Sequence, residues 1–237
     1  MNIKKFKDNT KAIILCAHGS KDKQYKEDFL KLTKKVKKKL KSKSIFHCFV
    51  EINQPLIRDC IETLWSKYKN IYLFPLMFFD GYHMIKDIKQ EVRYQKEKRK
   101  VNIKLVERIS LKDDLSSIFR KEVSKKIEKS KENVLVVSSS KSSNVNLKEE
   151  LGRYLDQISS GLEIEEYFFL DQDSSKVNNL IKSKGGNLNI IIHPIFFFEG
   201  FLYKMNIKKF KDNNVKALRP ISQYEKVIDL IVRKLKF

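Results

Sequence analysis

Short apolar runs alternate with longer, charged amphipathic segments along the chain. The runs are rich in Val, Ile and Phe with few polar interruptions, which is typical of strands that helices cover on both faces. The pattern predicts strands at 12–17, 45–50, 71–75, 101–106, 134–137, 164–170 and 188–193. It predicts helices at 22–40, 55–69, 83–96, 113–129, 147–159, 174–184, 201–210 and 223–234.

This strict alternation predicts a doubly wound α/β fold with parallel sheets. The chain also repeats itself: 12–36 resembles 133–158, with Ser20 opposite Ser140, and 69–88 resembles 188–207, with Pro75 opposite Pro194. The two alignments have offsets of 120 and 119 residues. We therefore expect two tandem flavodoxin-like units, residues 1–128 and 129–237. They join near a charged stretch at 126–131, unless a helix runs through it.

The 237 residues include 50 Lys and Arg but 29 Asp and Glu, which gives a formal net charge of +21. Such an excess attracts polyanions, including nucleic acid, anionic lipid and polycarboxylated small molecules. Lysine is spread through the whole chain, however. This distribution favours a general compositional bias over a selected binding patch.

Composition also bears on location. No apolar run reaches the roughly 18 residues of a membrane-spanning helix, and the N-terminus is too polar for a secretory signal. The three cysteines, Cys16, Cys48 and Cys60, have no CxxC spacing, which favours buried thiols in a reducing compartment. We expect a soluble, cytoplasmic protein with no membrane partner.

Two histidines and a glutamate follow three successive predicted strands of the first half. His18 ends the first strand in CAHGS, and Glu51 follows the second in CFVEINQP. His83 comes after the third strand and a glycine, at the start of a helix. The carboxyl ends of parallel strands share one edge of the sheet, so these side chains can converge on one crevice. Taken singly, each also fits an ordinary structural role.

Two imidazoles and a carboxylate with open coordination positions suit a borderline divalent ion such as Co²⁺ or Fe²⁺. The same groups accept protons, and the amino end of a helix disfavours a protonated imidazole at His83. The second half lacks this set, because Ser138 aligns with His18 and Leu202 with His83.

The two remaining histidines have no such partners in the pattern. His47 lies inside a predicted strand, and His193 lies at the end of another. We interpret both as structural, with a place in a cleft as the less favoured interpretation of His193.

The segments AIILCAHGSKD, FVEINQPLIRDCI and PLMFFDGYHMIKDI resemble, in this order, the signature segments of the sirohydrochlorin chelatases. These are the class II cobalt- and iron-chelatases of cobalamin and sirohaem biosynthesis. The resemblance covers the whole chain and is to the long, duplicated, CbiX-like form, whose second half keeps the chelatase fold and loses the histidines. It implies a lyase that inserts Co²⁺ or Fe²⁺ into sirohydrochlorin, a polycarboxylated tetrapyrrole. By the same resemblance, His18 and His83 bind metal and assist deprotonation, with Glu51 as their acidic partner.

The metal is thus expected as a substrate, and no nucleotide is expected, in line with the absence of a GxxxxGK[ST] loop. A monomeric pseudo-dimer and a homodimer both fit. Three other functions stay open: a chelatase for another tetrapyrrole or for nickel, a non-catalytic metal- or tetrapyrrole-binding carrier with the same fold, and a nucleic-acid binder. The last is least favoured, since no recognition motif is present and the basic residues are dispersed.

Overall fold

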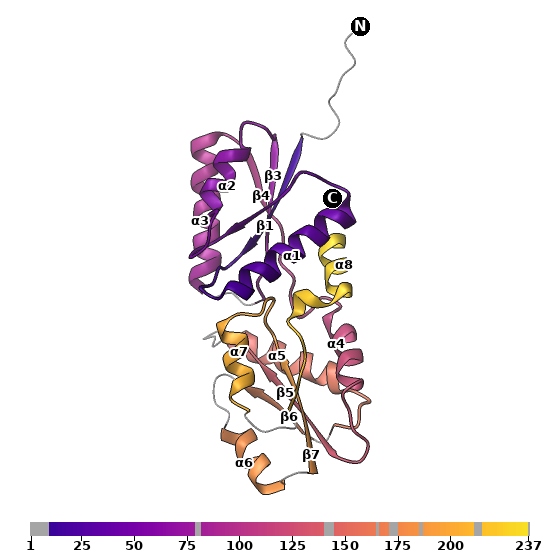
Figure 1. Ribbon diagram of the computed structural model, residues 1–237. Coiled ribbons are helices and arrows are strands. Elements are labelled where there is room, and N and C mark those ends of the chain that lie inside the picture. The colour runs from indigo at the N-terminus through magenta and orange to yellow at the C-terminus, as the bar shows by residue number, and fades with distance from the viewer. Residues whose placement is uncertain are drawn as a thin grey trace. The chain divides into compact units, whose positions relative to one another are not determined.

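The computed structural model describes residues 10–78, 82–139, 145–164, 166–170, 175–184, 187–210 and 215–236. They form two four-stranded parallel sheets with flanking helices, so the predicted α/β fold is confirmed (Figure 1). The first sheet and its helices are β1 Lys11–Ala17, α1 Lys23–Leu40, β2 Ile45–Phe49, α2 Ile57–Leu64, β3 Asn70–Pro75, α3 Tyr82–Arg99 and β4 Asn102–Leu105. Then follow α4 Leu115–Ser124, β5 Glu132–Ser138, α5 Val145–Ser159, β6 Glu166–Leu170, α6 Ser175–Lys184, β7 Leu188–Pro194, α7 Phe201–Lys208, β8 Val215–Ala217, the 3₁₀ turn η2 Ile221–Gln223 and α8 Glu225–Lys234.

Both sheets have the same strand order. It is β2-β1-β3-β4 in the first and β6-β5-β7-β8 in the second, with every neighbouring pair parallel. The connection from β1 leads to β2 on one side of β1, and the next connection crosses to β3 on the other side. In open α/β sheets the loops at the carboxyl ends of two such strands form the usual ligand crevice.

By its internal contacts the chain separates into two compact units, Met1–Ile109 with Ile228–Phe237, and Ser110–Val227. The first unit thus includes most of α8. Asp229 of α8 pairs with Lys39 of α1 at 2.6 Å. Lys234 donates to the carbonyl of Arg108 at 3.3 Å. These contacts hold the C-terminal helix against its own unit.

In the first unit, side chains alternate between two covered faces of the sheet. One face packs against α2 and α3 in a core that includes Ile14, Leu73, Ile61 and Ile88. The three cysteines lie in this same core and are free and buried, as the sequence predicts. The other face meets α1, where the ring of Phe29 lies 5.1 Å from that of Phe49.

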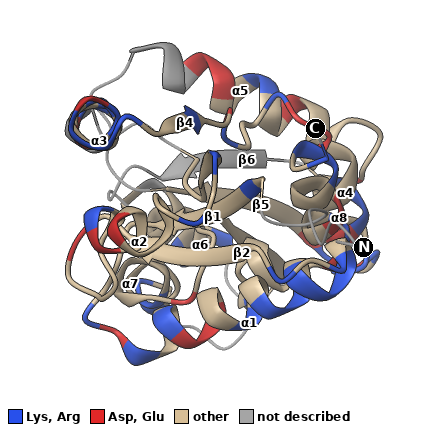
Figure 2. Ribbon diagram, turned by 90° about the horizontal axis from the view of Figure 1, so that it is seen from above, with Lys and Arg blue, Asp and Glu red and all other residues tan. Residues whose placement is uncertain are grey.

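Helix α1 begins and ends where its sequence allows. The Asp22 side chain accepts the Gln24 N–H at 3.0 Å, which caps the first turn. Lys37, Lys38 and Lys39 lie in the last turn, where the helix dipole favours cations. Figure 2 shows the basic residues following one another along this helix.

The second unit repeats this arrangement with a different interior. Val136, Ile192 and Val177 belong to the core on the α6 side of the sheet. On the opposite face, the ring of His193 stacks on that of Phe119 with centroids 4.3 Å apart.

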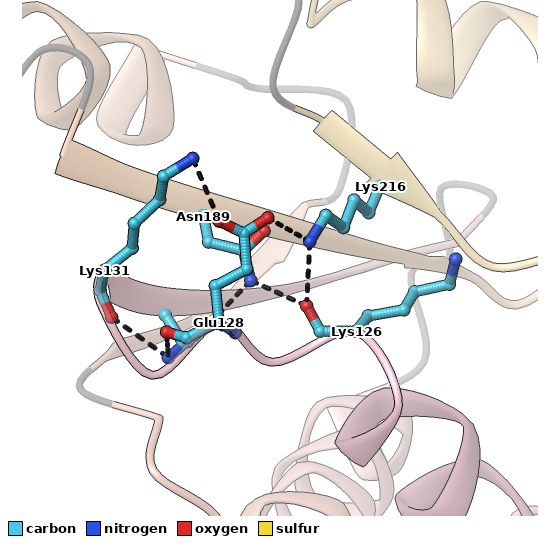
Figure 3. A network of polar contacts seen from close by, with 6 residues as sticks. Lys126, Glu128, Lys131, Asn189 and Lys216 are labelled. Atoms are coloured by element: carbon cyan, nitrogen blue, oxygen red, sulfur yellow. Dashed lines mark hydrogen bonds and ion pairs between the residues drawn. The ribbon is translucent and has the colours of Figure 1, made fainter.

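The stretch that joins the halves is not helical, because α4 ends at Ser124 and not near 129. Glu128 is the centre of a polar network there: it pairs with Lys131 at 3.0 Å and with Lys216 of β8 (Figure 3). Asn189 donates to the carbonyl of Lys126 at 2.8 Å. The Lys216 ammonium and then Lys131 hold the pKa of Glu128 below its ordinary value. Strand β8, which takes part in this network, is too short for the sequence pattern to predict.

The strand register corrects the alignment of the two halves. Cys16 lies opposite Pro75, and Ser138 lies opposite Pro194. Because Pro75 and Pro194 are equivalent, Ser138 corresponds to Cys16 and not to His18. The counterpart of His18 is then residue 140, outside the described residues. The polar residues after β5 resemble those after β1 at more than one offset, whereas backbone hydrogen bonds allow one register.

Candidate metal centre

The three predicted site residues lie around the carboxyl edge of the first sheet. His18 directly follows β1, and Glu51 comes two residues after β2. His83 is the second residue of α3, which follows β3. The side chain of His83 lies outside the described residues.

The structure brings His18 and Glu51 together. Their Nδ1 and Oε1 atoms are 3.3 Å apart, and the side chains are 42% and 57% exposed. The contact lacks hydrogen-bond alignment, so the buried Nδ1 atom has no hydrogen-bond partner among the described residues. Since Nδ1 is buried, the exposed surface of this imidazole belongs to its other atoms. Imidazole and carboxylate are both groups that bind divalent metals.

Backbone bonds hold the two loops side by side beyond the ends of their strands. Val50 donates to the carbonyl of Ala17 at 2.9 Å, and Glu51 donates to that of His18 at 3.0 Å. Gly19 has φ +110°, and a Cβ atom at this position would overlap the carbonyl oxygen of Glu51. Glycine is therefore required here both by backbone conformation and by the close approach of the second loop.

The Glu51 loop begins with a tight turn. Asn53 donates its backbone N–H to the carbonyl of Glu51 at 2.7 Å, and the residue between them, Ile52, has φ +65°. This is a three-residue turn of positive φ, a rare and strained conformation for a β-branched residue. The Asn53 side chain faces the first loop, where its Oδ1 accepts the Ser20 N–H at 2.7 Å.

Tyr25 supports the His18 turn from α1. Its hydroxyl makes backbone hydrogen bonds with Gly19 and His18, while burial raises the pKa of the phenol well above its ordinary value. The phenol therefore stays neutral. The turn that carries His18 is held by Tyr25 on one side and by the Glu51 loop on the other.

The third loop is anchored by a basic residue. Arg108, which follows β4, donates its guanidinium N–H to the carbonyl of Phe78. Phe78 is the last described residue before the segment that leads to His83. Among the described side chains, no group of three His, Cys, Asp or Glu residues is arranged to hold a metal ion. The three-residue site thus stays a prediction.

The other two histidines lie elsewhere in the fold. His47 sits inside β2 with its ring 6.0 Å from that of Phe29, and burial lowers its pKa. His193 is fully buried, and its Nε2 lies 2.9 Å from the Tyr154 hydroxyl. Burial lowers the pKa of His193 to about 3, which keeps the ring neutral. Both therefore belong to the packing of their units.

The sequence did not predict the roles of three residues that support the loops of this edge: Tyr25, Asn53 and Arg108. Each side chain contacts the backbone of a loop at this edge, and no motif or periodicity marks such a contact.

Comparison with known families decides the relationship. Residues 12–126 match the family model described as CbiX. Over this segment the chain is similar to the CbiX family. The predicted resemblance is thereby confirmed, and the matched segment contains all three candidate residues. A search of curated protein sequences finds no match to the chain.

Solved structures extend the likeness beyond the CbiX segment. SirB from Bacillus subtilis with Fe³⁺ has a TM-score of 0.77 and 16% identity, covering 96% of this chain and 94% of that one. The sirohydrochlorin chelatase SirB from Bacillus subtilis subspecies spizizenii, in complex with cobalt, has a TM-score of 0.73 with the same identity and coverage. CbiX, described as the terminal enzyme for siroheme biosynthesis in denitrifying bacteria, has a TM-score of 0.68 at 10% identity and covers 95% of this chain and 98% of that one. At these identities the likeness establishes the fold.

In the described part of the chain, no helix is both long and apolar enough to cross a membrane.

Proposed function

We propose that this protein is a sirohydrochlorin chelatase, a lyase that inserts Co²⁺ or Fe²⁺ into the tetrapyrrole without a nucleotide. The observation that carries the proposal is the contact between His18 and Glu51 at the carboxyl edge of a CbiX-type sheet. It places an imidazole and a carboxylate, two groups that bind divalent metals and accept protons, beside the loops where this fold binds ligands.

The metal substrate is held by His18, Glu51 and His83. Glu51 lies beside His18, which brings two of the three ligands together at this edge of the sheet. Backbone placement supports the third ligand, because His83 lies in the first turn of α3, directly after the loop that follows β3. Imidazole and carboxylate ligands accept cobalt, iron and nickel alike, and geometry and supply decide among them.

The chemistry is an exchange of two pyrrole protons for one divalent ion. An exposed imidazole takes up a pyrrole proton in its neutral form, and the imidazolium that results is stabilised by the adjacent Glu51 carboxylate. Release of each proton to water returns the site to its starting state. As the ion passes from the imidazoles of His18 and His83 to the tetrapyrrole nitrogens, each freed imidazole accepts one pyrrole proton, so two protons leave the macrocycle for one divalent ion.

We assign this site to residues 1–128 and regard residues 129–237 as the degenerate half. The histidine of the second half supports this division, since His193 is buried in its core and bonded to Tyr154. The excess positive charge of the chain suits a substrate with several carboxylates. Lys21 and Lys23 follow the His18 turn and are exposed, which makes them candidates for pairing with those carboxylates.

The test is an anaerobic assay in which sirohydrochlorin is mixed with Co²⁺ or Fe²⁺ and the absorbance shift of metal insertion is followed. We expect His18→Ala and Glu51→Gln to lower the enzymatic rate by about 10- to 100-fold or more. His47→Gln is the matched control, since it removes a histidine of the same sheet that lies outside the site, and it should keep the wild-type rate.

Equal rates for wild type and His18→Ala, both at the uncatalysed background, would reject a chelatase. Tight stoichiometric binding of metal or tetrapyrrole without product would identify a carrier of the same fold instead. Preference between the two metals, measured under competition, assigns the metal.

A further inference from the structure

The two loops that carry His18 and Glu51 are joined by one side chain that belongs to neither residue. The Asn53 Oδ1 atom accepts the Ser20 N–H at 2.7 Å and so spans 33 positions of the chain. This side-chain hydrogen bond joins the loop after β1 to the loop after β2. Backbone bonds at the strand ends also link the two loops.

The position of Glu51 depends on the turn that Asn53 closes. The Asn53 N–H donates to the Glu51 carbonyl, and the same carbonyl lies against Gly19. The turn requires Ile52 at φ +65°, a conformation that a β-branched residue leaves when it is not held. Asn53 therefore contacts both sides of the pair, through its backbone to Glu51 and through its side chain to the residue two positions after His18.

We propose that Asn53 is the positioning residue that sets the distance between His18 and Glu51, by fastening the strained Glu51 turn to the His18 loop. The inference rests on the proposed function, because positioning matters to a metal site made by these two residues. Asn53 acts through the backbone and does not itself bind the metal. Its removal lets Ile52 relax and moves the Glu51 carboxylate away from the imidazole.

The experiment compares Asn53→Ala with Asn53→Asp in the full chain. Alanine removes the Oδ1 acceptor, whereas aspartate keeps an oxygen at the same distance along the side chain. Asn102→Ala is the matched control: its side chain joins two segments at the opposite end of the same sheet, donating to Asn70 Oδ1 at 2.6 Å. The control loses one comparable hydrogen bond far from His18.

Three readouts separate positioning from general stability. The first is the exchange rate of the Ser20 amide by NMR, which we expect to rise about fivefold or more in Asn53→Ala. The second is the Kd for Co²⁺ alone, which we expect to weaken by about 10- to 100-fold. The third is the kinetic split, in which kcat falls by a similar factor while KM for sirohydrochlorin stays nearly constant. Asn53→Asp should restore most of each loss, and Asn102→Ala should leave all three values unchanged.

The outcomes also distinguish this inference from the proposed function. If wild type binds Co²⁺ but does not metallate sirohydrochlorin, the chelatase proposal fails, and the amide exchange and Co²⁺ affinity still decide the role of Asn53. If Asn53→Ala keeps the wild-type Ser20 exchange rate and Co²⁺ affinity, the positioning role is overturned, whatever the enzymatic activity. Equal losses in Asn53→Ala and Asn102→Ala would overturn it too, because they would reflect stability alone.

Discussion

The Nε2 atom of His193 lies 2.9 Å from the hydroxyl of Tyr154, inside the core of the second unit. Neither group is exposed, and burial moves their pKa values in opposite directions, lowering that of His193 to about 3 and raising that of Tyr154 well above its ordinary value. Both groups are therefore neutral, and the pair is a hydrogen bond and not an ion pair. A histidine in this state makes folding sensitive to acid.

The stability of the second unit should fall as the pH drops below about 6.5. The unfolded chain binds a proton at His193 near that pH, while the folded chain, with a pKa of about 3, does not. Stability is thus fully present above the unfolded pKa and is lost as the pH falls. Between pH 7 and 5 the loss from this group is about 2 kcal/mol. The free energy of unfolding in urea should differ between wild type and His193→Gln, and this difference should narrow by that amount from pH 7 to pH 5. A difference that stays constant with pH would contradict the assignment.

Replacing Gly19 with alanine should damage the site and the first unit together. The new Cβ would meet the Glu51 carbonyl, and φ +110° is unfavourable for any residue with a Cβ. We expect a loss of about 1–3 kcal/mol in the free energy of unfolding, together with weaker Co²⁺ binding. Gly152→Ala is the control, because nothing lies within 4 Å of its new Cβ. It lies inside α5, so it should stabilise the protein by about 0.5–1 kcal/mol. Thermal unfolding measures both.

Ile52→Gly should stabilise the chain although it removes a large side chain. That side chain is 53% exposed, so little burial is lost. Relief of strain at positive φ is worth about 1–3 kcal/mol, against a glycine entropy cost of about 0.5–1 kcal/mol. A net gain of about 1 kcal/mol is expected in urea unfolding. Ile52→Ala removes the same exposed atoms but keeps a Cβ, so it should gain little. Equal stabilities of the two variants would show that the backbone is not strained.

The three thiols should be unreactive in the folded protein. Cys16, Cys48 and Cys60 are buried, and burial raises the pKa of Cys48 well above its ordinary value and that of Cys60 to about 12. The thiolate is the reactive form, and the raised pKa values leave almost none of it on Cys48 and Cys60 at neutral pH. Cys16 is shielded by its burial. Iodoacetamide should label none of the three under native conditions at pH 8 and all of them in denaturant, as counted by mass spectrometry. Rapid labelling under native conditions would show that the core of the first unit unfolds locally and exposes its thiols.

Most strands were predictable because their signal is local. Runs such as 12–17 and 188–193 are apolar and β-branched at nearly every position, and the structure places β1 and β7 within one residue of those limits. Elements whose ends depend on distant partners were less predictable. Helix α4 stops at Ser124, and Asn133 accepts the Glu128 N–H at 2.9 Å in the non-helical stretch that follows. Strand β8 has three residues and pairs with β7, a contact that no sequence window contains.

The candidate site divides in the same way. The places of His18 and Glu51 at one edge followed from the rule that parallel strands end together, and the structure brings the two side chains to 3.3 Å. The joint geometry with His83 stays a prediction. The contacts that set the pair, from Gly19, Tyr25 and Asn53, could not be predicted. They depend on how the folded backbone brings particular atoms together, and no sequence pattern marks them.

The sequence by itself determined the fold class, the two-fold repetition and the residue types available for metal chemistry, because periodicity and composition are properties of short stretches of chain. The tertiary structure decided the register that equates Ser138 with Cys16, the burial of His193 against Phe119, and the fastening of Ser20 to Asn53. These depend on which backbone groups meet across the sheet. That information exists only when the whole unit has folded.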